Sequence, residues 1–166
     1  MKKTKSLIPK SGNDIVYTPD ELANSIVEYF DIKGTVLEPC RGGGAFERAL
    51  QNKKSVTQIR YCELSEGVDF MEYKGKTDWI VTNPPWSKFR EFLDKACNHT
   101  NDIIFLVTIN HFTTKKRLSI MKEYGFRFKE ILLVDTPKSF PQSGFQVAAI
   151  HISKNYKGEC KWNYLT

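Results

Sequence analysis

The fold of this chain is decided by residues 35–50, TVLEPCRGGGAFERAL. A short apolar stretch ends at Glu38, glycines occupy positions 42–44, and apolar and charged residues then alternate at helical spacing up to Leu50. Glycines at this point allow a tight turn and let a ligand approach the backbone where a Cβ would collide. The stretch therefore predicts a strand, a turn and a helix, the unit from which open α/β sheets are built.

Strand and helix patterns alternate along the rest of the chain. Helices are predicted in residues 17–30, 87–100 and 113–125, and strands in 58–64, 78–82, 102–109, 129–135 and 145–153, with the short segment 67–70 in the position of a further strand. Thr18, Pro19 and Glu21 fit a capping box with proline at the first helical position. Residues 136–144 are too few for a crossover helix, so the last two strands are predicted to be antiparallel. The sum is an open, mostly parallel α/β sheet with one antiparallel strand near the C-terminus.

Composition narrows the class of protein. The 166 residues fit one domain, and a net charge of +6 favours a polyanionic partner over a merely solvated basic surface. The four cysteines are far apart and form no C-x-x-C pair, so neither a metal site nor a disulfide framework is indicated, and a cytoplasmic setting is expected. Neither a signal peptide nor a long apolar span stands out. We expect residues 1–14 to be a flexible basic tail and 15–166 to be one catalytic domain.

Ligands of such sheets bind beyond the carboxyl ends of the strands. Glu63 lies there, about twenty residues past the glycines, where a carboxylate can accept both hydroxyls of a ribose. A nicotinamide site would have a glycine in place of Glu47, and the Gly-Lys-Ser/Thr of a P-loop is missing. These residues alone indicate a nucleoside-containing cofactor, with a structural turn and a solvated acid as the alternative.

Five segments in order carry a resemblance to a known family: YTP (17–19), LEPCRGGGAF (37–46), the acid of CEL (62–64), GVDF (67–70) and NPPW (83–86). Together they resemble the S-adenosylmethionine-dependent amino-methyltransferases, above all the N6-adenine DNA methyltransferases. The resemblance runs from Tyr17 to Val147 and implies a single-domain Rossmann-like methyltransferase fold of seven strands with helices on both faces. Glu38 stands where Asp is commoner in that family, and Arg41 either points away from the cofactor or contacts its carboxylate.

The resemblance also implies roles for individual residues. S-adenosylmethionine would be bound by Tyr17, Thr18, Pro19, Glu38, Cys40, Gly42, Gly44, Phe46, Glu63, Asp69, Phe70 and Asn83. The catalytic segment would be Asn83, Pro84, Pro85 and Trp86. An exocyclic amino group is a poor nucleophile because its lone pair is delocalised into the ring. The Asn83 side-chain oxygen and the Pro84 carbonyl would accept its two N–H groups and free that lone pair.

A flipped adenine would stack on Trp86, with Phe140 or Phe145 on its other face. Cations that serve a polyanion should follow strands, and those that do so here are Lys88, Arg90, Lys115, Lys116, Arg117 and Lys138, with His111 nearby. The cluster at 115–117 fits the solvated face of its helix equally well. The predicted partner is DNA. The alternatives are an RNA adenine or guanine amino-methyltransferase, a protein glutamine methyltransferase, and an inactive binding subunit of the same fold. Because the length leaves no room for a target-recognition region, we expect either a relaxed sequence preference or recognition supplied by a second copy or a partner chain.

Overall fold

The computed structural model describes residues 16–166, so the predicted tail at 1–14 lies outside the described residues. Seven strands form one sheet in the order β2-β1-β3-β4-β6-β5-β7. The strands are β1 (Gly34–Glu38), β2 (Val56–Tyr61), β3 (Trp79–Thr82), β4 (Asp102–Thr108), β5 (Phe126–Leu133), β6 (Val147–Lys154) and β7 (Lys161–Tyr164). The helices are α1 (Asp20–Tyr29), α2 (Ala45–Gln51), α3 (Phe89–Cys97) and α4 (Lys115–Tyr124). Short 3-10 turns are η2 (Leu64–Glu66), η3 (Phe70–Glu72), η4 (Trp86–Lys88) and η5 (Ile109–His111).

The sheet is mostly parallel, as predicted. In the described part of the chain only β6 runs antiparallel to its neighbours, β4 and β5. The segment 67–70 is not a strand, because Asp69 begins the turn η3 by accepting the N–H of Met71 with its side chain. The seventh strand is instead β7, which pairs in parallel with β5 and which the sequence pattern did not reveal.

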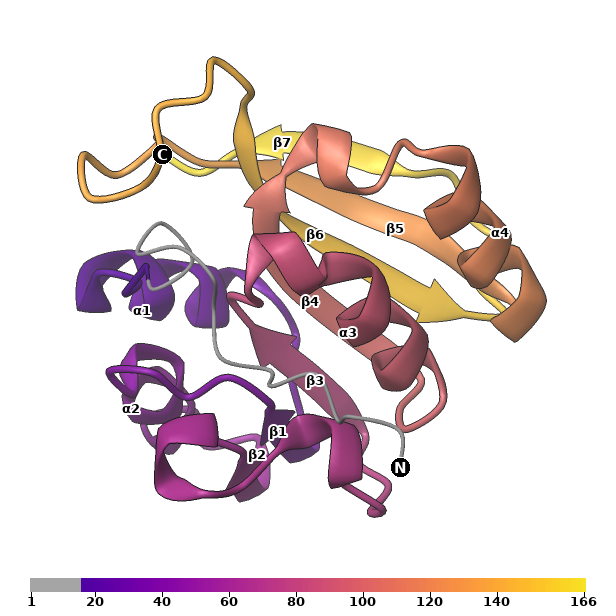
Figure 1. The fold of residues 1–166 in the computed structure, drawn as a ribbon. Coiled ribbons are helices and arrows are strands. Elements are labelled where there is room, and N and C mark those ends of the chain that lie inside the picture. The colour runs from indigo at the N-terminus through magenta and orange to yellow at the C-terminus, as the bar shows by residue number, and fades with distance from the viewer. Residues whose placement is uncertain (1–15) are drawn as a thin grey trace, which may run out of the picture.

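Two apolar layers hold the helices to the two faces of the sheet. Successive residues of β1 point to opposite faces, so Val36 packs toward α1 and α2 while Leu37 packs toward α3 and α4. Figure 1 shows α3 and α4 on one face and α1 and α2 beyond the other. The strands in the middle of the sheet are buried on both sides, which explains their continuous apolar sequences.

The helix ends show one correct prediction and one error. Gly125 ends α4 with a left-handed backbone (φ 76°), as predicted. The predicted capping box at α1 is wrong, because the N-cap is Pro19 and no side chain caps the helix. The hydroxyl of Thr18 is used elsewhere, as an acceptor for the side chain of Asn83.

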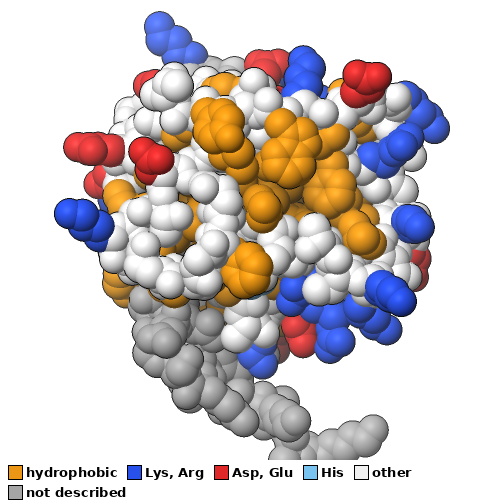
Figure 2. Space-filling view, turned by 90° about the horizontal axis from the view of Figure 1, so that it is seen from above, with side chains coloured by type: hydrophobic (Ala, Val, Ile, Leu, Met, Phe, Trp, Pro, Cys, Tyr) orange, Lys and Arg blue, Asp and Glu red, His pale blue; other side chains and the backbone are white. Residues whose placement is uncertain are grey.

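The C-terminal strand β7 extends the sheet without adding to its core, since all four of its residues are exposed. Figure 2 looks down on the side of the molecule where β7 and residues 134–146 lie, and apolar side chains gather there. Trp162 and Tyr164, 57% and 75% exposed, lie on this strand. In residues 16–166 none of the helices has the length and apolar character needed to cross a bilayer.

Candidate active site

A cavity of about 560 Å³ lies where β1, β2 and β3 end. Seven of the predicted cofactor-binding residues line it: Tyr17, Cys40, Gly42, Glu63, Asp69, Phe70 and Asn83. Five others do not reach its surface: Thr18, Pro19, Glu38, Gly44 and Phe46. The structure therefore brings together residues from five separate segments of the sequence, and it places the remaining predicted residues beneath or beside the cavity wall.

Glu63 is the acidic residue that follows β2, and its carboxylate is held by three hydrogen bonds. Its Oε2 accepts the backbone N–H of Gly42 (2.8 Å), while its Oε1 accepts the backbone N–H (3.0 Å) and the hydroxyl (2.6 Å) of Ser65. Partial burial raises the pKa of this carboxyl, but the hydrogen bonds from Ser65 and Gly42 outweigh burial and hold the pKa below its ordinary value. Glu63 is thus ionised at neutral pH and retains lone pairs for further donors.

The glycine turn presents its backbone to the cavity at Gly42. Gly42 has a left-handed backbone (φ 51°), and a Cβ there would lie 3.3 Å from the ring of Tyr17. Tyr17 itself is 60% exposed and lies over Gly42 and Gly43. Glycine at position 42 therefore lets the ring of Tyr17 pack directly against the turn.

Glu38 is buried beneath this turn. It is 1% exposed, and among the described residues its Oε2 has no hydrogen-bond partner. Burial, together with the charge of Glu47, raises the pKa of Glu38 from 4.5 to about 9. Its carboxyl is therefore protonated at neutral pH, although the sequence reading treated it as a group at the cofactor's surface.

Asp69 and Phe70 form the far end of the cavity. The carboxylate of Asp69 accepts the N–H of Met71 (2.8 Å), which fixes the side chain at the start of η3. Phe70 is almost fully buried and lies 5.2 Å, ring to ring, from Phe92 of α3. An acceptor beside a pair of aromatic rings is a suitable environment for a flat heteroaromatic group.

Asn83 connects the cavity to the segment before α1. Its side-chain Nδ2 donates to the carbonyl of Val16 (3.1 Å) and to Oγ1 of Thr18 (3.3 Å). With both N–H groups used in this way, Oδ1 is the atom of the amide that remains to accept a proton donor. The structure thus sets the orientation of the amide by contacts that the sequence did not predict.

The rest of the tetrapeptide is rigid and partly buried. Pro84 is buried, and Pro85 begins η4 with its carbonyl accepting the N–H of Lys88. The ring of Trp86 lies 5.3 Å from His111 and 6.0 Å from Phe140, and its indole N–H points to the carbonyl of Leu106 (3.4 Å). Trp86 therefore forms part of an aromatic cluster beside the cavity, not part of its lining.

The predicted substrate-binding residues divide by exposure. Phe140 is 2% exposed and supports Trp86 edge-on, so it offers no free face to a base, whereas Phe145 is 55% exposed. Burial and the nearby charge of Arg117 lower the pKa of His111, which is therefore neutral at neutral pH, and its Nδ1 lies 2.6 Å from the hydroxyl of Thr108. The cations Arg90, Lys115, Lys116 and Lys138 are exposed. Lys88, predicted to contact the substrate, lines the cavity.

Several residues that line the cavity were not predicted from the sequence. Leu64, Ser65, Val68 and Met71 come from the segment between β2 and β3, and Glu91 and Phe92 come from the first turn of α3. The i, i+3 spacing of Lys88 and Glu91 was a usable signal, because such residues share a helix face. The turns η2 and η3 gave no comparable signal, since they lack a regular period.

Comparison with known proteins places the chain in a family. The profile of the family described as adenine-specific methyltransferase EcoRI matches residues 45–158, which is more than half of the chain. The chain belongs to this family. Membership confirms the predicted class of S-adenosylmethionine-dependent adenine methyltransferases, and with it the predicted cofactor.

Two relatives agree with this assignment. The Type II methyltransferase M.EcoRI of Escherichia coli is 36% identical over 59 residues, which cover 36% of this chain and 17% of the relative. The Type II methyltransferase M.AccI of Acinetobacter calcoaceticus is 28% identical over 109 residues, covering 53% of this chain and 20% of the relative. The matches thus span about a fifth or less of each relative.

The fold assignment is supported separately. A Listeria monocytogenes protein described as a candidate class I S-adenosylmethionine-dependent methyltransferase superposes with a TM-score of 0.67 at 13% identity. The superposition covers 94% of this chain and 68% of the other. The predicted Rossmann-like methyltransferase fold, with its mixed seven-stranded sheet, is therefore confirmed.

Proposed function

We propose that residues 16–166 form the catalytic domain of a methyltransferase that transfers a methyl group from S-adenosylmethionine to the N6 amino group of adenine in DNA. The observation that carries the proposal is the orientation of Asn83. Its Nδ2 is bound to Val16 and Thr18, so its Oδ1 is left as the acceptor beside the cavity that the glycine turn and Glu63 line. Family membership supports the same reading.

The residues that line the cavity fit the cofactor. The ionised carboxylate of Glu63 would accept ribose hydroxyls, and Asp69 with Phe70 would hold the adenine. Tyr17 and Gly42, which both line the cavity, would lie against the methionine part. When bound, S-adenosylmethionine supplies an electrophilic methyl group on a sulfonium. Thr18, Pro19 and Phe46 would act from behind the wall, by supporting the segments that carry Tyr17 and the glycine turn.

The chain's own contribution to the reaction is positioning. Oδ1 of Asn83 and the carbonyl of Pro84 would each accept one N–H of the target amino group, which pulls electron density back onto its nitrogen. Asn83 is not a base, so it does not remove the proton. The proton leaves to solvent after transfer, when the methylated amine is cationic and strongly acidic. Rigid prolines at 84 and 85 keep the two acceptors at a fixed separation.

The target base would stack beside the tetrapeptide. Trp86 is half-buried, and Phe145 is the exposed aromatic of the loop 134–146 on the same edge of the sheet. An exposed path of cations, which includes Arg90 and Lys115, would contact the phosphate backbone. Together these features support base flipping from duplex DNA, with recognition aided by a second copy or a partner chain.

The test is a labelled transfer assay with product identification. The protein is incubated with labelled S-adenosylmethionine and, in parallel, with DNA, RNA or protein, and the modified unit is identified by mass spectrometry. N6-methyladenine in DNA is expected. Label in RNA, in glutamine or on cytosine would contradict the proposed substrate, and absence of transfer to any of them would contradict the proposed activity.

The variant Asn83→Ala tests the role of the amide. We expect the transfer rate to fall by about a hundredfold or more, because one acceptor of the target amino group is lost. Cofactor affinity should fall by less than about tenfold, because only two neutral hydrogen bonds to the segment before α1 disappear. Asn52→Ala, at an exposed position after α2, is the matched control and should change neither quantity. Unchanged transfer by Asn83→Ala would refute the role of Asn83.

A further inference from the structure

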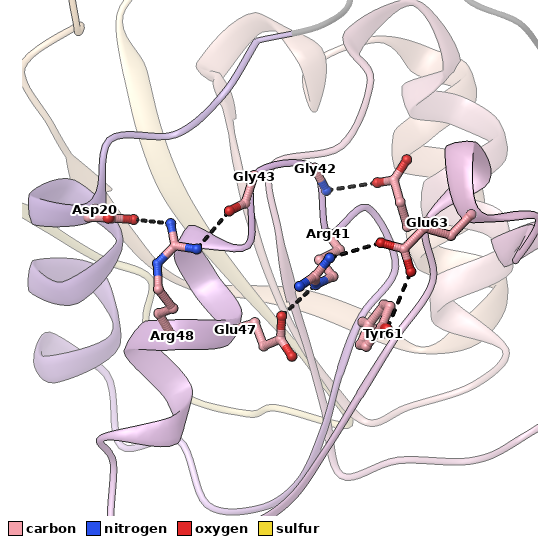
Figure 3. A network of polar contacts seen from close by, with 9 residues as sticks. Asp20, Arg41, Gly42, Gly43, Glu47, Arg48, Tyr61 and Glu63 are labelled. Atoms are coloured by element: carbon pink, nitrogen blue, oxygen red, sulfur yellow. Dashed lines mark hydrogen bonds and ion pairs between the residues drawn. The ribbon is translucent and has the colours of Figure 1, made fainter.

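Two arginines that do not line the cavity hold the glycine turn. Arg41 bonds Glu47 through Nε (2.5 Å) and Glu66 through Nη1 (2.9 Å). Arg48 bonds the carbonyl of Gly43 through Nη1 (2.7 Å) and Asp20 through Nη2 (2.6 Å). Figure 3 shows these contacts around the turn. We call these five charged residues (Asp20, Arg41, Glu47, Arg48 and Glu66) the arginine network, and it ties the turn to α1, α2 and η2.

The backbone conformation explains why position 44, next to the network, is glycine. Gly44 is buried with a left-handed backbone (φ 77°), and it does not line the cavity. A Cβ at Gly44 would lie 3.1 Å from Nη1 of Arg48 and 3.7 Å from Nε of Arg41. Gly42 therefore leaves room for the ring of Tyr17, whereas Gly44 supplies a left-handed backbone next to the guanidinium group of Arg48.

Arg41 points away from the cavity, which settles the choice that the sequence left open. Its guanidinium lies 4.7 Å from the centre of the Tyr61 ring, and it is absent from the cavity lining. From there its charge adds to the hydrogen bonds that keep the pKa of Glu63 low. The carboxylate of Glu63 also accepts the N–H of Gly42. Contacts of Arg41 and Glu63 therefore fix the position of the turn together.

We infer that Arg41 and Arg48 are positioning residues that hold the glycine turn and Glu63 ready for the nucleoside of the cofactor. The inference rests on the proposed function, because it assumes that the cavity binds S-adenosylmethionine. Exposed ion pairs contribute little to global stability. A loop that is already ordered, however, does not lose conformational entropy when its ligand binds. The effect of the network should therefore appear in cofactor affinity and hardly at all in the melting temperature.

The experiment measures binding directly, by isothermal titration of S-adenosylhomocysteine. We expect Arg41→Gln and Arg48→Gln each to weaken binding by about fivefold, with the melting temperature lowered by no more than about 3 °C. Arg41→Lys, which keeps the charge but loses the forked geometry, should weaken binding less than Arg41→Gln does. Arg60→Gln is the matched control, because Arg60 is an exposed arginine of β2 outside the network.

A salt series on the unchanged protein gives a second readout that does not depend on a variant's folding. Raising the ionic strength screens exposed ion pairs, so affinity of the wild-type protein should decline with salt. The double variant Arg41→Gln/Arg48→Gln should show a flatter dependence. Wild-type affinity retained in both single variants, or equal salt dependence in wild type and double variant, would overturn the inference. If the wild-type protein itself fails to bind, the proposed function fails as well.

Discussion

Replacing Glu38 by glutamine should change how the stability of the protein depends on pH. Glu38 is buried beneath the glycine turn, and burial raises its pKa from 4.5 to about 9. The folded protein therefore holds a proton that the unfolded chain releases above about pH 4.5. The stabilisation is complete below that value and is lost as the pH rises toward the folded-state pKa of about 9.

The magnitude follows from the linkage between proton binding and folding. Each pH unit within this window costs about 1.4 kcal/mol, so Glu38 should lower the free energy of unfolding by about 3 kcal/mol between about pH 6 and pH 8. Glutamine keeps the shape of the protonated acid but cannot ionise. Glu38→Gln should thus gain stability relative to wild type by about that amount across the same interval.

Urea unfolding of both proteins at several pH values measures this difference. Other titrating groups are common to the two proteins, so the difference between their free energies of unfolding isolates Glu38. A difference that is the same at about pH 6 and pH 8 would show that Glu38 does not titrate in this interval, and the reasoning from its burial would be refuted.

Two further predictions concern the substrate edge and the core. Phe145→Ala should weaken binding of DNA that carries an unpaired target adenine by about tenfold. Tyr164→Ala, on the exposed strand β7, is the control and should not weaken binding. Fluorescence anisotropy measures both affinities, and equal losses would exclude a stacking role for Phe145. Oδ1 of Asp102 lies 2.8 Å from Nε2 of the buried His151. Burial raises the pKa of Asp102, but hydrogen bonds from His151 and Ser153 outweigh burial and lower this pKa below its ordinary value of 3.8. The pair stabilises the folded protein above about pH 3.8, and this stability is lost as the pH falls through the lowered pKa of Asp102. Asp102→Asn should therefore lower the free energy of unfolding by about 1–3 kcal/mol near neutral pH and make it depend less on pH in acid. An acid unfolding curve identical to that of wild type would contradict this.

The sequence predicted those parts of the fold that have a regular period. The strands β3, β4 and β6 are continuous apolar stretches, and α3 shows helical spacing at Phe89 and Leu93, so pattern and structure agree there. The strand β7 was missed although polar and aromatic residues alternate in it, because the run is only four residues long. Segment 67–70 was misplaced because apolar residues in a short turn look like a strand.

The site was predictable wherever residues follow strands, because the carboxyl ends of parallel strands meet at one edge. Gly42, Glu63 and Asn83 line one cavity for this reason. What the sequence could not give is the direction of each side chain. Nothing in the pattern shows that Glu38 turns inward or that Phe140 supports Trp86, since both depend on packing between elements far apart in the chain.

The contacts of Asn83 link the two halves of the proposed site. The residue was predicted from its oxygen, which would accept the target amino group, but the structure shows that its nitrogen holds the segment that carries Tyr17. Tyr17 in turn lies against Gly42, whose N–H binds the carboxylate of Glu63. A continuous chain of contacts therefore runs from the proposed acceptor of the target amino group to the proposed acceptor of the ribose. An aspartate at position 83 would keep the oxygen and lose both donors. The choice of Asn over Asp in this chain is thus explained by the segment that the amide holds, because either residue could accept the amino group.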